Sequence, residues 1–75
     1  MYTHPKCIEY DKFKTAEAEE LENSGYILSE ERAKYYSEKE NELLSQMSNE
    51  ELQELIDTPN LPSQAKAYYA QFIKD

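Results

Sequence analysis

The sequence predicts an all-α fold, a compact three- to four-helix bundle with short connections. Its 75 residues contain one glycine and three prolines, so few positions interrupt regular structure. Strand-type alternation is confined to Ile8 and Tyr10, whereas several segments repeat apolar residues at the helical period. We expect one domain over residues 1–75, with helices at about 10–23, 30–46, 49–57 and 62–74.

The first predicted helix, 10–23, has a thin apolar face formed by Phe13, Ala16 and Leu21. Gly25 follows at a position where helices commonly end with a left-handed residue. The stretch before this helix is predicted to be either a short capped turn or an extended segment.

Tyr26, Ile27 and Leu28 form an apolar connector directly after Gly25. A hydrophobic contact often accompanies a helix C-terminus of this kind. We therefore predict that the connector belongs to the core.

The second predicted helix, 30–46, begins after Ser29, a favourable N-cap residue. Glu30 and Glu31 lie in its first turn, where carboxylates meet the positive end of the helix dipole. The apolar positions follow one helical stripe. They are Ala33, Tyr36, Leu43, Leu44 and Met47.

Glu40 falls inside this stripe, and a buried carboxylate requires a partner. We predict that Glu40 lies at the rim of the core, where it accepts a hydrogen bond from a tyrosine hydroxyl or pairs with Lys66 or Lys74. The alternative is that part of the stripe is an interface.

The third and fourth helices each have a clear start signal. Ser48 and Glu51 form a capping box before the apolar residues of helix 49–57. Pro59 ends that helix, and Pro62 starts helix 62–74 at a position that tolerates proline. The last helix matches the full amphipathic template with Ala65, Tyr68, Tyr69, Phe72 and Ile73.

Acidic residues outnumber basic ones by sixteen to eight, and residues 17–57 alone contain thirteen acids and three bases. A field of this sign repels nucleic-acid backbones and anionic lipids. The sequence also lacks a long apolar run and a signal-peptide pattern. We expect no direct nucleic-acid binding, no membrane span and a cytoplasmic location.

His4 and Cys7 have a spacing that supplies half of a zinc site. A structural site normally takes four Cys or His ligands, and the sequence has no second pair. Gly-rich phosphate loops and serine elbows are absent as well. We therefore expect no catalytic residue, no metal and no cofactor.

The side of the second helix opposite the apolar stripe carries Glu31, Tyr35, Glu38 and Glu42 at spacings of four, three and four. Carboxylates around an aromatic anchor suit an electrostatically steered contact with a basic partner. The alternative is a solvated face that only keeps the protein soluble. These four residues are the candidate partner-binding site.

The expected function is that of a small acidic interaction module, an inhibitor or regulator that occupies a basic surface of a larger protein, including a nucleic-acid-binding one. Anti-defence or host-takeover proteins of phages and mobile elements are the analogy. The alternative is a structural or regulatory subunit that assembles through apolar surface, with the oligomeric state open. Its tyrosines would be Tyr2, Tyr10, Tyr35 and Tyr68 or Tyr69.

Overall fold

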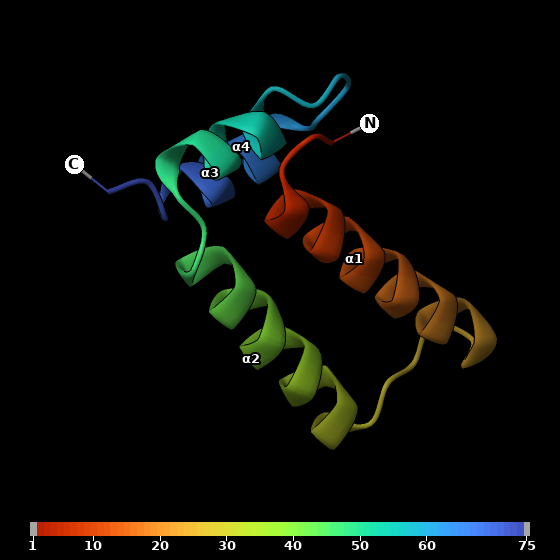
Figure 1. Ribbon diagram of the computed structural model, residues 1–75. Coiled ribbons are helices and arrows are strands. Elements are labelled where there is room, and N and C mark those ends of the chain that lie inside the picture. Colours follow the sequence, from red (N-terminus) through yellow and green to blue (C-terminus); the bar gives the residue numbers. More distant parts are fainter. Residues whose placement is uncertain (1, 75) are drawn as a thin grey trace.

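The computed structural model describes residues 2–74 and confirms the all-α prediction. Within these residues the chain forms four helices and no strands. They are α1 (Pro5–Asn23), α2 (Glu30–Ser45), α3 (Asn49–Ile56) and α4 (Ser63–Ala70). Figure 1 shows α1 and α2 as a long hairpin, with α3 and α4 packed together at its open end. None of the four helices is both long enough and apolar enough to cross a membrane.

The core lies where the open end of the hairpin meets α3 and α4. Leu44 and Leu52 are fully buried there, beside the half-buried aromatic rings of Tyr69 and Phe72. One cluster contains seven buried residues, namely Cys7, Tyr10, Leu43, Leu44, Met47, Leu52 and Leu55. Burial of this apolar surface is the main stabilising term of a small domain.

The hairpin extends well beyond this core because its helices are much longer than the other two. At 1.5 Å per residue, α1 spans about 28 Å, whereas α3 and α4 span about 12 Å each. We call residues 14–42, the part of the hairpin beyond the core cluster, the arm. Among the described residues of the arm, Tyr36 alone is buried. The molecule is elongated, 37 × 24 × 22 Å, because the hairpin extends beyond the core.

α1 begins at Pro5, about five residues earlier than the sequence predicts. Proline is favourable at this first helical position because its missing N–H would have no partner there. His4, the N-cap residue, forms no side-chain cap. The carboxylate of Glu54 on α3 takes that role, because its Oε1 accepts hydrogen bonds from the backbone N–H groups of Thr3 (2.8 Å) and His4 (3.3 Å).

The end of α1 follows the prediction at Gly25, which has φ 71°. The Tyr26 N–H donates to the Leu21 carbonyl (2.6 Å), and the Gly25 N–H donates to the Glu22 carbonyl (3.3 Å). These two bonds form a Schellman motif. Tyr26 also has a positive φ, 66°, which is unfavourable for a residue with a side chain.

The predicted N-caps of α2 and α3 are both confirmed. Ser29 Oγ accepts a hydrogen bond from the Arg32 N–H at 3.2 Å. In the capping box, Ser48 Oγ accepts from the Glu51 N–H (3.2 Å), and Glu51 Oε1 accepts from the Ser48 N–H (2.7 Å). Both caps satisfy backbone donors that the helix itself leaves free.

α4 ends at Ala70 rather than at the predicted residue 74. Residues 71–73 continue as tight turns with i to i+3 hydrogen bonds. The side chain of Asn49 explains the change of direction, because it donates to the Lys74 carbonyl (2.5 Å) and accepts from the Lys74 N–H (2.8 Å). Such paired bonds hold the chain against the start of α3 instead of letting it continue as helix.

The connector Tyr26–Leu28 is not part of the core, so its predicted burial is wrong. Tyr26 is 74% exposed and Ile27 is 76% exposed, whereas Leu28 is half-buried. The connector lies at the far end of the arm, where α3 and α4 do not reach (Figure 1). Ala33, predicted in the apolar stripe, is exposed for the same reason.

Candidate functional site

The four predicted partner-binding residues, Glu31, Tyr35, Glu38 and Glu42, are all exposed on α2. The Tyr35 side chain is 47% exposed and forms an edge-on contact with the ring of Tyr36, 5.2 Å between centroids. The buried neighbour thereby supports the exposed ring. The arm as a whole has nine acids and four bases, a net charge of −5.

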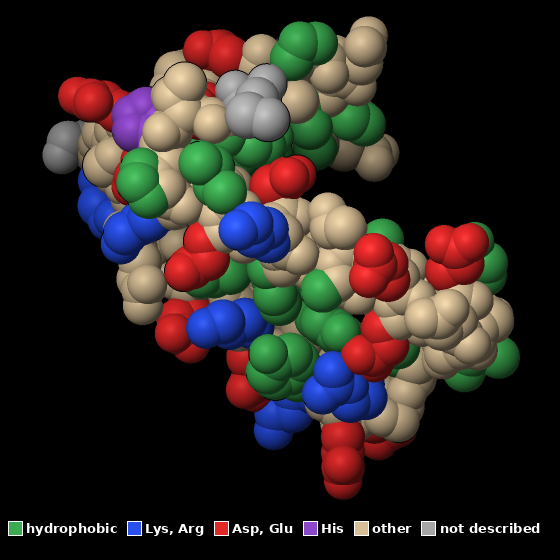
Figure 2. Space-filling model, turned by 45° about the vertical axis from the view of Figure 1, so that its right-hand side comes forward, with side chains coloured by type: hydrophobic (Ala, Val, Ile, Leu, Met, Phe, Trp, Pro, Cys, Tyr) green, Lys and Arg blue, Asp and Glu red, His purple; other side chains and the backbone are tan. Residues whose placement is uncertain are grey.

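Basic side chains of α2 lie between these acids. Lys34 Nζ is 3.8 Å from Glu38 Oε1, and Lys39 Nζ is 3.9 Å from Glu42 Oε1. The Arg32 guanidinium lies 4.9 Å from the centroid of the Tyr35 ring. Figure 2 accordingly shows acidic and basic side chains interspersed over the surface. Exposed pairs of this kind contribute little to stability.

The tip of the arm presents Tyr26 and Ile27 to solvent, and Glu30 and Glu31 follow them at the start of α2. Large exposed apolar side chains rimmed by charged residues often mark interaction sites. The left-handed backbone of Tyr26 adds local strain that the Schellman motif maintains. The tip is therefore an exposed apolar point at the end of an acidic arm.

The two helices of the arm are joined by the buried ring of Tyr36, which packs against Phe13 of α1 at 5.6 Å between centroids, and by a charged cluster beside it. Arg32 Nε and Nη2 donate to the two carboxylate oxygens of Glu20 at 3.0 and 2.7 Å. The Tyr36 hydroxyl donates to Glu20 Oε1 at 2.6 Å. These bonds from Arg32 and then Tyr36 lower the pKa of Glu20 to about 2. The bidentate geometry fixes the position of α2 against α1.

Glu40 lies at the boundary between arm and core, half-buried as predicted. Its Oε2 accepts a hydrogen bond from the Tyr10 hydroxyl at 2.7 Å, which confirms the predicted tyrosine partner. The cation beside it is Lys14, 3.4 Å away, and not Lys66 or Lys74. Burial, followed by hydrogen bonds with Tyr69 and Glu40, raises the pKa of Tyr10. Tyr10 is only 3% exposed, so it does not belong to an exposed tyrosine surface.

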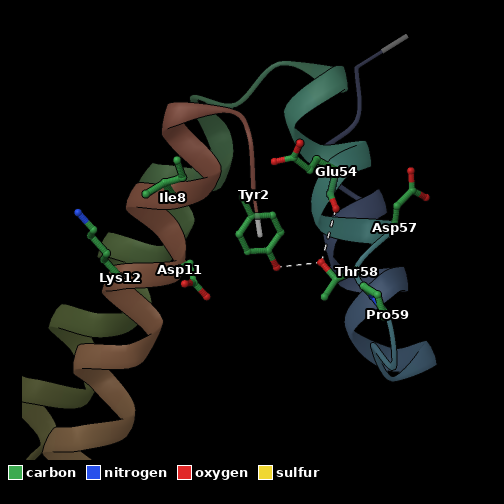
Figure 3. A pocket seen from close by; sticks show the side chains of 8 residues that line it. All are labelled: Tyr2, Ile8, Asp11, Lys12, Glu54, Asp57, Thr58 and Pro59. Atoms are coloured by element: carbon green, nitrogen blue, oxygen red, sulfur yellow. Dashed lines mark hydrogen bonds between the residues drawn. The ribbon is translucent and has the colours of Figure 1, made fainter.

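An open groove of about 680 Å³ separates the outer side of α1 from the C-terminal end of α3 (Figure 3). Tyr2 stands between the two sides, and its hydroxyl is 2.8 Å from Thr58 Oγ1. The groove is lined by Tyr2, Ile8, Asp11, Lys12, Glu54, Asp57, Thr58 and Pro59. Acidic and apolar side chains are thus mixed here as they are on the arm.

His4, Cys7 and Glu54 meet beside this groove. His4 Nδ1, Cys7 Sγ and a carboxylate oxygen of Glu54 lie within 4.8 Å of one another. Hydrogen bonds lower the pKa of Glu54 to about 2, chiefly one from the Thr3 hydroxyl to Oε2 (2.5 Å). The structure thus adds a third donor to the pair that the sequence identified.

The Cys7 thiol is fully buried and donates to the Glu51 carbonyl at 3.2 Å. Burial, followed by the negative charge of Glu54, raises its pKa to about 12. A thiol in this state is protonated at neutral pH and is a poor nucleophile. The arrangement does not suit cysteine-based catalysis.

Comparisons of the chain with protein-family models, curated proteins and solved structures find no match.

Reasoning from the sequence missed several of these features, including the Glu20–Arg32 ion pair and the groove beside Tyr2. The exposure of Tyr26 and Ile27 was missed because apolar residues next to a helix end usually pack inward. Glu54 was missed because it stands fifty residues from His4 and, in the sequence alone, cannot be told apart from the other glutamates. No local pattern links Glu54 to His4, because their contact depends on how α3 docks against α1.

Proposed function

We propose that this protein acts by binding, and that the arm contacts a basic surface of a larger protein. The observation that carries the proposal is the exposure of Glu31, Tyr35, Glu38 and Glu42 together on an arm with a net charge of −5. An inhibitor or regulator of this type occupies a basic site, including one that binds nucleic acid. Phage and mobile-element proteins directed at host defence are an analogy for this mode of action.

The physical argument combines long-range attraction with a local anchor. Acids spaced along a rigid helix steer a basic partner toward the arm and raise the rate of association. Tyr35 supplies amphipathic contact area at a small loss of conformational entropy, as tyrosines do in many interfaces. The Glu20–Arg32 ion pair holds α2 in place before binding, so less conformational entropy is lost on association.

The proposal places the protein in the cytoplasm and assigns it no catalytic role. A single unpaired thiol suits a reducing compartment. The buried, protonated state of Cys7 supports a role other than catalysis.

The test is affinity capture from a lysate of the source cells with the full chain immobilised. The Debye length, the distance over which charges act on each other in solution, falls from about 10 Å at 0.1 M salt to about 3 Å at 1 M. We expect the captured partner to elute as salt rises and to be displaced by added nucleic acid if its basic surface binds nucleic acid.

Matched variants make this test specific. The triple variant Glu31→Gln, Glu38→Gln, Glu42→Gln is expected to lose the partner. A control triple, with exposed Glu9→Gln, Asp11→Asn and Glu50→Gln at the core end, has the same net charge and is expected to retain it. If both triple variants lost the partner equally, the change in net charge alone would explain the loss, and a site on the arm would be refuted.

A second candidate function is assembly through the apolar tip, favoured by the exposure of Tyr26 and Ile27. In this case the protein is a structural or regulatory subunit. Capture would then survive high salt and be lost in the double variant Tyr26→Ser, Ile27→Ser. Sedimentation at increasing protein concentration separates self-assembly from binding to another protein.

A further inference from the structure

Three side chains with metal-binding atoms meet where the start of α1 contacts α3. His4 is the N-cap residue of α1, and Cys7 lies three residues later on the same side. Glu54 reaches them from α3, and the three donor atoms lie within 4.8 Å of one another. We propose that His4, Cys7 and Glu54 form a Zn²⁺ site, with water as the fourth ligand.

The donor set fits zinc by type and by charge. Zn²⁺ binds imidazole nitrogen, thiolate sulfur and carboxylate oxygen, and a three-residue site commonly leaves the fourth position to water. With a neutral His4, a thiolate at Cys7 and an ionised Glu54, the ligands contribute a charge of −2. That charge balances a divalent cation.

The distances require only a small adjustment. Bonds of about 2.0–2.3 Å in a tetrahedral site place neighbouring ligand atoms roughly 3.5 Å apart. The donor atoms of His4, Cys7 and Glu54 are separated by at most 4.8 Å, so the widest gap closes by about 1.3 Å or less. Side-chain rotation of the partly exposed His4 and Glu54 supplies this movement.

The carboxylate of Glu54 has one oxygen for the helix cap and another for the ion. Oε1 accepts the backbone N–H groups of Thr3 and His4. Oε2 accepts the Thr3 hydroxyl and lies 3.0 Å from His4 Nδ1. The ion replaces the contacts of Oε2 alone, so the cap of α1 persists in the bound state.

Access to the site is from one side. Cys7 closes the site toward the core, whereas the side chains of His4 and Glu54 are 37% and 21% exposed. The ion and its water therefore enter from solvent. The positive end of the α1 dipole, about half a unit charge, opposes the cation but is smaller than the charge of the ligands.

Binding exchanges one proton for the ion. The Cys7 S–H bond breaks, the sulfur forms a bond to Zn²⁺, and the proton leaves to solvent. His4 binds through Nδ1 and keeps its proton on Nε2, and no electron is transferred. Affinity therefore rises with pH, as it does for other thiolate sites.

The test uses Co²⁺ as a spectroscopic probe for the zinc site, with the full chain under reducing conditions. We expect a sulfur-to-cobalt charge-transfer band and the strong visible bands of tetrahedral Co²⁺ at one equivalent. Added Zn²⁺ should abolish these bands and raise the Tm, whereas Mg²⁺ in excess should do neither. Mg²⁺ prefers oxygen ligands in octahedral geometry, which distinguishes the site from general binding to surface acids.

Variants assign the ligands. Cys7→Ser should remove the charge-transfer band. His4→Gln and Glu54→Gln should each weaken Zn²⁺ binding by about tenfold or more. Glu50→Gln removes an exposed carboxylate from the same helix and should leave binding unchanged. His4 is partly exposed, so its variant stays folded and decides the question if Cys7→Ser unfolds.

Two results would overturn the proposal. One is Co²⁺ binding without a charge-transfer band in the folded wild-type protein. The other is Zn²⁺ affinity that His4→Gln leaves unchanged. Neither result affects binding by the arm, because the ligands of this site lie at the core end and outside residues 14–42.

Discussion

The core end and the arm are held together by different forces. At the core end, seven buried residues from α1, α2, α3 and the connection between α2 and α3 pack into one cluster. In the arm, Tyr36 is the one buried residue that the structure describes, its ring packs against Phe13 of α1, and the Glu20–Arg32 ion pair adds a bidentate link between the two helices. Apolar burial stabilises one region, whereas charge-assisted hydrogen bonds and a single buried ring position the other.

This difference bears on function because an arm with little core can carry many exposed charges. A region that depends little on apolar burial can change its surface residues without loss of the fold. The core end, in contrast, tolerates few changes because its interior is closely packed. A binding surface on the arm and a stable scaffold at the core end are therefore compatible within 75 residues.

The largest expected effect is at the centre of the core. Leu44→Ala removes a fully buried side chain and should reduce the free energy of unfolding by about 2–5 kcal/mol. Leu28→Ala, the same substitution at a half-buried site in the arm, should have less than half of that effect. Urea unfolding measures both. Equal losses would contradict the division into core and arm.

A smaller effect is expected at the cap of α3. Ser48→Ala removes the hydroxyl that accepts the Glu51 N–H and should reduce the free energy of unfolding by about 1 kcal/mol. Ser48→Asp preserves an acceptor at the N-cap and should retain most of the stability. Thermal unfolding followed by circular dichroism compares the three proteins.

The arm is expected to respond to pH through Glu20. Its pKa is lowered to about 2 in the folded protein from an ordinary 4.5, so the ionised carboxylate stabilises the arm above that ordinary value. This stabilisation is lost as pH falls from 4.5 toward 2, because protonation breaks the bonds from Arg32 and Tyr36. Amide NMR spectra across that range should change first in the arm.

Glu20→Gln provides the control for that pH response. The variant should show several-fold faster hydrogen exchange in the arm at neutral pH, with core amides unchanged. Its arm signals should also lose the acid-dependent change below pH 4.5. A titration identical to that of the wild type would assign the response to another group.

The smallest effect on stability is expected at the tip. Ile27→Ser changes a side chain that is 76% exposed and should alter the free energy of unfolding by less than about 0.5 kcal/mol. Urea unfolding checks this value beside that of Leu44→Ala. A loss above 1 kcal/mol would mean that the tip is packed in solution.

Local signals in the sequence predicted most of the fold. Gly25, Ser29 and the Ser48–Glu51 box each act within a few residues, so the end of α1 and the starts of α2 and α3 could be placed correctly. The tyrosine partner of Glu40 was also predictable, since a carboxylate in an apolar stripe requires a donor.

Features that depend on distant residues could not be predicted in this way. The cap of α1 comes from Glu54, and the end of α4 is set by Asn49, 25 residues before Lys74. The exposure of Ile27 follows from the unequal lengths of the helices, which no local pattern records. The four candidate residues on α2 are exposed, and their role in binding remains a prediction.

The cap of α1 by Glu54 has a consequence for the order of folding. Thr3 and His4 are synthesised before Glu54, so their backbone N–H groups have no acceptor on Glu54 until about fifty more residues have followed. Closing a loop of that length carries an entropic cost that local helix formation does not. The N-cap residue of α1 and the residue before it therefore gain these bonds only when α3 docks, whereas the bond from the Ile8 N–H to the His4 carbonyl forms within α1 itself.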